Sequence, residues 1–227
     1  MRYCQEIVPE LQGFNLLMAV DQAIEAMTDD ISALQRAPLS IDQAASIYFY
    51  TMETPFYALL NTAMRSEDRN VVKPFLKFCK LFLSALYLLR LPVAAITVSR
   101  GVKAHLIDEY PKGRKFRWWQ FSSSTASLDT LQSPQFCGKV GQRTVFHIST
   151  RYCVDVCKFS AMKRVEDERL ILPGMQLYVK AVVNYGNDLF HIQLEEVAGT
   201  LPLLDYLHPD LVTSPHPNHN HMLAPHS

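Results

Sequence analysis

The chain has 227 residues, of which 48% are hydrophobic, enough to bury the core of one globular domain. Its 22 basic and 22 acidic residues balance, so no overall field favours nucleic acid or an anionic membrane, and a bound anion must be held by local groups. The most apolar stretch, residues 81–96, is interrupted by Ser84, Arg90 and Pro92, which excludes an unbroken membrane-spanning helix.

The first third of the chain is predicted to be helical. Apolar residues recur every three or four positions between residues 16 and 34, the period of an amphipathic helix. A second helix is predicted from residue 41 to about residue 50, because Ser40 and Gln43 have the spacing of a capping box. Pro55 and Pro74 each suit a first helical turn, and the apolar stripes after them predict two more helices, the second over residues 75–89.

From residue 91 onward, short β-branched and aromatic runs alternate with turn residues, which is typical of strands. The predicted strands are residues 94–99, 115–121, 144–149, 169–172, 175–184 and 188–197. The sequence Tyr-Gly-Asn-Asp at 185–188 predicts a hairpin, and residues 128–131 predict a short helix or turn. The polar, Pro-rich segment 212–227 predicts a disordered tail, whose histidines are not expected to form a metal site.

The N-terminus lacks the apolar stretch of a signal peptide, which favours a reducing compartment or export without a cleaved signal. Five cysteines cannot all pair within one chain, so no disulfide framework is expected. Cys153 and Cys157 lie four residues apart, but no second pair of ligands follows at regular spacing. We therefore predict buried or incidental thiols and no metal.

Three polar motifs each lie beside an apolar, strand-like run. Arg100 and Gly101 end the first run, Ser123-Ser124-Thr125 follow the second, and Glu166-Asp167-Glu168 precede the third. A guanidinium stays charged and donates in a fork to phosphate oxygens, so Arg100 suits an anion site, and Gly101 would let the backbone approach a ligand closely. The alternative for an isolated arginine is a surface ion pair.

The acidic motif predicts paired carboxylates. In an extended segment, Glu166 and Glu168 project to the same side, where they repel each other without a structural reason. By analogy with glycoside hydrolysis, the inner carboxylate would stabilise an oxocarbenium-like sugar and the outer one would handle the nucleophile. A hydroxyl such as that of Ser123 would hold the reactive carboxylate in place. The alternatives are a solvated acidic turn and ordinary turn serines.

In this order the motifs resemble the arginine-serine-glutamate class of mono-ADP-ribosyltransferases. That family pattern has an aromatic residue, a variable residue and then Ser-Thr-Ser, and Phe121 to Thr125 keeps it with the last two hydroxyl residues exchanged. The resemblance implies that NAD is the substrate, bound by Arg100, Gly101, Ser123, Ser124 and Thr125. It also implies that Ser123 orients Glu168, that Glu168 is the catalytic carboxylate, and that Glu166 accompanies transfer to arginine.

The resemblance extends upstream, where Tyr50, Tyr57 and Asn61 match helical residues that lie near the nicotinamide in the family. The structural alternative places Tyr57 and Asn61 on a buried helix face. The segment before the glutamates departs from the arginine-specific pattern, because it carries Lys163 and Arg164 instead of Pro-rich or aromatic residues. That departure leaves the acceptor open.

The resemblance implies an α+β fold with a helical lobe packed on a two-sheet, mainly antiparallel β-core and an NAD cleft between them. We expect one domain over residues 1–211, with the lobe at 1–90 and the core at 91–200. The predicted activity is transfer of ADP-ribose to an arginine of a protein partner, without metal, nucleic acid or membrane. The alternatives are an NAD glycohydrolase, a transferase to another acceptor, and a catalytically silent NAD-binding or interaction module.

Overall fold

The computed structural model describes residues 2–30, 34, 37–90, 95–127, 131, 137–162 and 168–198. The helices are α1 (Arg2–Ile7), α2 (Leu16–Asp29), α4 (Ile41–Thr51), α5 (Pro55–Arg65) and α6 (Leu76–Leu89). The 3₁₀ segments are η1 (Pro9–Leu11), η2 (Arg69–Phe75), η3 (Ile107–Glu109) and η5 (Cys157–Phe159). The strands are β1 (Ile96–Val102), β2 (Lys115–Trp118), β3 (Ser122–Thr125), β4 (Arg143–Thr150), β5 (Cys153–Asp155), β6 (Glu168–Ile171), β7 (Met175–Asn184) and β8 (Leu189–Glu196). Within these residues, no helix is long and apolar enough to cross a bilayer.

The helix starts follow the capping chemistry of the sequence. The capping box is confirmed, because Gln43 N donates to Ser40 Oγ at 3.2 Å and Ser40 N donates to Gln43 Oε1 at 2.9 Å. Pro55 occupies the first turn of α5 as predicted. The prediction for Pro74 was wrong in detail, since Pro74 lies inside η2 and α6 begins at Leu76. Helix α1 was not predicted.

The strands form one eight-stranded sheet in the order β2-β7-β8-β4-β1-β3-β6-β5. Every neighbouring pair is antiparallel except β4 and β8, which are parallel. All six predicted strands are present, and residues 175–184 match β7 at both ends. The hairpin between β7 and β8 is confirmed, with positive φ angles at Gly186, Asn187 and Asp188.

The predicted division into two sheets is not confirmed, because the hydrogen-bonded order is continuous. The sheet nevertheless has a narrow junction. All seven residues of β1, from Ile96 to Val102, pair with β4, whereas β1 pairs with β3 only through Ser99 and Thr125. Strands β3, β6 and β5 therefore form a smaller part of the sheet beyond this junction.

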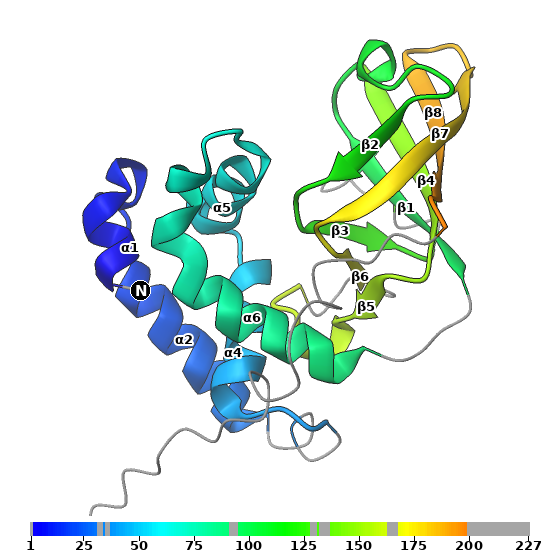
Figure 1. Cartoon of the computed structure of the whole chain (residues 1–227). Helices are drawn as coiled ribbons and strands as arrows, with labels where there is room; N and C mark the ends of the chain where they lie inside the picture. The colour runs from blue at the N-terminus through cyan, green and yellow to red at the C-terminus, as the bar shows by residue number, and fades with distance from the viewer. Residues whose placement is uncertain are drawn as a thin grey trace, which may run out of the picture.

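The smaller part of the sheet packs against the helices (Figure 1). Buried Leu170 and Phe121 belong to the same hydrophobic cluster as Phe82 of α6 and Tyr50 of α4. Strands β1, β2, β4, β7 and β8 enclose a second cluster around Phe146 and Trp118. The junction between the two clusters lies at β1, β3 and β6, the strands that carry Arg100, Ser123 and Glu168.

Candidate functional site

Described residues of all three polar motifs lie on three adjacent strands. Arg100 lies in β1, Ser123 to Thr125 lie in β3, and Glu168 is the first residue of β6. The sheet order places β3 between β1 and β6, so residues far apart in the sequence become neighbours. Glu168 lies directly opposite Thr125 across the β3–β6 pair.

Arg100 reaches from β1 to β3. Its Nη1 donates to the carbonyl oxygen of Ser123 at 2.9 Å. Burial lowers the pKa of Arg100, while Tyr50 acts to raise it and Arg65 to lower it. No carboxylate among the described residues lies within ion-pair distance of Arg100, so the surface ion pair considered above is not formed with them. A partly buried guanidinium with no carboxylate partner among the described residues is suited to bind an anion.

Gly101 has a structural reason to be glycine. A Cβ atom at this position would lie 2.5 Å from Cys137 Cβ and 3.2 Å from Cys137 Cα. Carbon atoms pack at about 3.5 to 4.0 Å, so the missing side chain makes room for the buried Cys137. The predicted close approach of Gly101 to a ligand stays a prediction.

The hydroxyl residues of β3 divide between the two faces of the strand. Ser122 Oγ accepts from Trp118 Nε1 at 3.2 Å, and Ser124 Oγ donates to the carbonyl of Arg169 at 2.8 Å. Ser123 and Thr125 lie on the other face, which they share with Glu168 because residues two apart project to the same side. Ser123 is the one residue of β3 that is not fully buried. Ser123 is therefore more accessible to a ligand than Ser124.

Glu168 is fully buried, with 0% of its surface exposed. Its Oε2 accepts from Ser160 Oγ at 2.5 Å, whereas Oε1 has no hydrogen-bond partner among the described residues. A buried carboxylate oxygen without a partner is costly, and such groups are rare outside functional sites. The hydroxyl that contacts Glu168 therefore belongs to Ser160, which the sequence analysis missed, while an orienting role for Ser123 stays a prediction.

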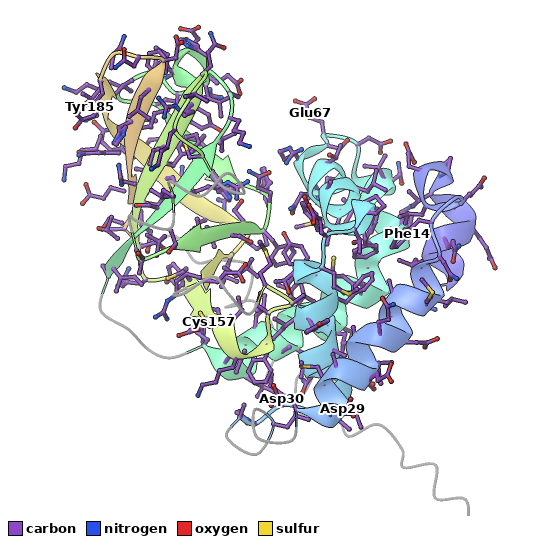
Figure 2. All side chains as sticks on the ribbon, turned by 180° about the vertical axis from the view of Figure 1, so that it is seen from behind. Phe14, Asp29, Asp30, Glu67, Cys157 and Tyr185 are labelled. Carbon is purple, nitrogen blue, oxygen red and sulfur yellow. The ribbon has the colours of Figure 1, made fainter. Side chains whose placement is uncertain are left out.

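The neighbourhood of Glu168 can be located in Figure 2 by the label of Cys157, which lies where the strands meet the helices. Cys157 Sγ donates to the carbonyl oxygen of Glu168 at 3.4 Å. Burial raises the pKa of the Cys157 thiol to about 11, and the nearby Asp155 also raises it. This thiol is therefore unsuited to act as a nucleophile near neutral pH.

Glu166, Lys163 and Arg164 lie outside the described residues. The predicted shared face of the two glutamates thus stays a prediction. Within the described part of the chain, no three His, Cys, Asp or Glu side chains gather as metal ligands would.

Tyr50 and Asn61 brace the start of β3. Tyr50 Oη donates to the carbonyl oxygen of Phe121 at 3.3 Å and accepts from Asn61 Nδ2 at 2.9 Å, while the Phe121 amide donates to Asn61 Oδ1 at 3.0 Å. Burial raises the pKa of Tyr50 well above its ordinary value. Asn61 and Arg100 act to lower it, and Glu168 raises it. Tyr50 thus lies within electrostatic range of both Arg100 and Glu168.

Tyr57 is more exposed than Tyr50 and Asn61, with 41% of its surface accessible to solvent. The alternative of a buried helix face is therefore wrong for Tyr57. Its ring centroid lies 6.3 Å from that of Tyr50. Of the three helical residues predicted to contact NAD, Tyr57 has the most accessible side chain.

A cationic and aromatic group at the β2–β3 connection was also missed from the sequence. Trp119 is 42% exposed, and the guanidinium carbons of Arg69 and Arg117 lie 5.8 and 5.4 Å from its ring. Next to it, Arg65 Nη1 donates to Gln120 Oε1. These residues bring positive charge from both the helices and the sheet to the edge of the site.

Comparison with known proteins gives one family. A family model described as NAD:arginine ADP-ribosyltransferase matches residues 21–201. No curated protein sequence matches the chain. Solved structures with a similar fold include the eukaryotic mono-ADP-ribosyltransferase ART2.2, at 22% identity over 86% of this chain and 82% of that one, with a TM-score of 0.64. The ADP-ribosyltransferase HopU1 of Pseudomonas syringae is 19% identical over 78% of this chain and 87% of that one, with a TM-score of 0.62. The Vis toxin from Vibrio splendidus, solved with agmatine, is 17% identical over 79% of this chain and 86% of that one, with a TM-score of 0.54.

Proposed function

The chain belongs to the NAD:arginine ADP-ribosyltransferase family, and we propose that it cleaves NAD and transfers ADP-ribose to an arginine side chain of a protein acceptor. The observation that carries this proposal is the arrangement of a partly buried guanidinium, Arg100 on β1, and a fully buried carboxylate, Glu168 on β6, on either side of the hydroxyl-rich strand β3. One oxygen of that carboxylate has no partner among the described residues. A ligand that presents phosphates and a developing sugar cation satisfies both groups.

NAD would bind between the helical lobe and the smaller part of the sheet. Arg100 would hold the pyrophosphate, with Gly101 and the hydroxyl residues Ser123 to Thr125 beside it. Tyr57 would contact the nicotinamide side, while Tyr50 and Asn61 hold the Phe121 peptide from which β3 starts. ART2.2 has been solved in complex with NAD, which supports NAD as the ligand of this fold.

The reaction breaks the bond between the ribose C1′ and the nicotinamide nitrogen. The bonding electron pair leaves with nicotinamide, which becomes neutral, and positive charge develops on the ribose. Glu168 faces this charge and stabilises it electrostatically. A guanidinium nitrogen of the acceptor then bonds to C1′, and its proton passes to Glu166, since a protonated guanidinium is a poor nucleophile.

The test is incubation of the protein with labelled NAD, with and without agmatine as a guanidinium acceptor. We expect label on agmatine with the wild type. Glu168→Gln keeps the shape but removes the charge, so both transfer and NAD hydrolysis should fall by roughly a hundredfold or more, the scale of losing one preorganised electrostatic group. Asp167→Asn, one residue away, removes an equal charge and serves as the control with near-normal rates. A Glu168→Gln variant with near-normal rates would remove this residue from the mechanism.

A second variant tests the arginine acceptor. Water needs less help as a nucleophile than a protonated guanidinium, so Glu166→Gln should abolish transfer to agmatine and leave much of the NAD hydrolysis. Equal retention of both activities would refute the arginine assignment. Free ADP-ribose as the only product of the wild type would identify a glycohydrolase, and unchanged NAD would identify a binding module.

A further inference from the structure

Ser160 contacts Glu168 more closely than any other described side chain. It is 1% exposed, and its Oγ lies 2.5 Å from Glu168 Oε2. The same Oγ accepts from the amide of Met162 at 3.0 Å. A serine hydroxyl has one proton to donate and two lone pairs. Because the Met162 amide occupies a lone pair, the hydroxyl proton is free to point at the carboxylate.

The backbone beside Ser160 is attached to the helical lobe. The amide of Ala161 donates to Thr51 Oγ1 at 2.8 Å, and Thr51 is the last residue of α4. The Thr51 hydroxyl in turn contacts the carbonyl oxygens of Ile47 and Tyr48 in the same helix, at 3.1 and 2.9 Å. The end of α4 thus fixes the position of Ser160 through two hydrogen bonds in series.

The two carboxylate oxygens of Glu168 differ in their hydrogen bonding. Oε2 is held by Ser160, and Oε1 is left without a protein partner among the described residues. We propose that Ser160 is a positioning residue, which sets the rotamer of Glu168 so that Oε1 is the oxygen offered to the ribose of NAD. This inference rests on the proposed function, because the positioned group is its catalytic carboxylate.

The experiment compares Ser160→Ala with wild type in steady-state NAD consumption, NAD binding by calorimetry and thermal unfolding. Without the hydroxyl, Glu168 keeps its charge but loses its fixed orientation, and misplacement by about 1 Å costs about a hundredfold. We expect kcat to fall by roughly ten- to a hundredfold while the Kd of NAD changes by less than about threefold. Ser160→Thr, which retains the hydroxyl, should recover most of kcat.

Ser122→Ala is the matched control. Ser122 is also 1% exposed and its hydroxyl also hydrogen bonds to a side chain, but that side chain is Trp118 rather than Glu168. Its kcat should stay near that of wild type even if its melting temperature falls. Thr51→Val removes the acceptor for the Ala161 amide and should lower kcat in the same direction as Ser160→Ala, by a smaller factor.

A Ser160→Ala variant with wild-type kcat would overturn the inference, as would a fall in kcat matched by Ser122→Ala at equal loss of stability. If Ser160→Ala does not fold, Ser160→Cys fills the same space with a weak donor, and wild-type kcat in that variant would overturn the inference equally. Failure of the proposed function has a different signature, because the wild type itself would then consume no NAD.

Discussion

The substitution Gly101→Ala tests whether this glycine is required by packing. The added Cβ would lie 2.5 Å from Cys137 Cβ, 3.2 Å from Cys137 Cα and 3.3 Å from Cys137 N. Carbon atoms in contact need about 3.5 Å or more, so strand β1 and Cys137 must separate by roughly 1 Å. Two of the three close atoms are backbone atoms, which a change of rotamer cannot move.

Overpacking of this kind costs about 1 to 3 kcal/mol. For a chain of this length, each kcal/mol lowers the melting temperature by about 2 to 4 °C, so we expect a fall of roughly 2 to 12 °C in differential scanning calorimetry. Gly13→Ala is the control, because no heavy atom lies within 4 Å of its added Cβ. That variant should keep the wild-type melting temperature or exceed it slightly.

A double-mutant cycle tests whether contact with Cys137 causes the loss of stability in Gly101→Ala. Cys137→Gly removes the Cβ that collides and should relieve part of the cost of Gly101→Ala, whereas Cys137→Ala retains that Cβ and should relieve none. Residues in direct contact show coupling energies of about 0.5 kcal/mol or more. Strict additivity of Gly101→Ala with Cys137→Gly, or a Gly101→Ala variant as stable as wild type, would refute this account.

Three further predictions concern other side chains of the sheet and the helices. Arg100→Lys keeps the charge but loses the forked donor, so calorimetry should show weaker NAD binding, and unchanged affinity would place the pyrophosphate elsewhere. Asn61→Ala leaves the Phe121 amide without its acceptor and should destabilise the protein by about 1 to 3 kcal/mol in denaturant unfolding, which an unchanged midpoint would contradict. Burial lowers the pKa of His147 and of His191, which hydrogen bond to each other at 2.8 Å, and the charge of His147 lowers that of His191 further. Because the unfolded chain then binds protons at higher pH than the folded protein, stability should fall as the pH drops below about 6.5, and His147→Gln should lose less stability than wild type between about pH 7.5 and 5.5.

The elements predicted from the sequence are those with a local cause. The capping box of Ser40 and Gln43 and the alternation from Met175 to Asn184 are contained in short stretches of sequence, and both are present in the structure. Strands β3 and β5 were missed. Strand β3 consists of four hydroxyl residues, which are typical of turns, and becomes a strand because its backbone pairs with β6.

In the site, too, some residues could be predicted from the sequence and others could not. Arg100, Ser123 and Glu168 were predicted to belong together because the order of their motifs resembles the family pattern, and the structure places them on neighbouring strands. Ser160 has no such signal, because it lies in a connection without periodicity and acquires its contact only when that connection folds against Thr51. Likewise, the exclusion of Tyr50 from solvent depends on Tyr57 of α5, Phe82 of α6 and Phe121, which no local pattern brings together.

The burial of Glu168 follows from the side of the sheet on which the apolar residues of β6 pack. Leu170, two residues on, belongs to the cluster shared with the helices, whereas Ile171 belongs to the cluster enclosed by the sheet. Since a strand has a period of two, the packing of Leu170 places Glu168 on the helical side and Arg169 on the other, where Arg169 pairs with Asp155 at 3.0 Å. A shift of the β6 register by one residue would bring Arg169 to the position opposite Thr125. Leu170 would then point toward the cluster enclosed by the sheet and Ile171 toward the helices, each on the opposite side from its present one. The strand register that buries the apolar residues therefore also removes the carboxylate from water, which strengthens its interaction with a developing positive charge.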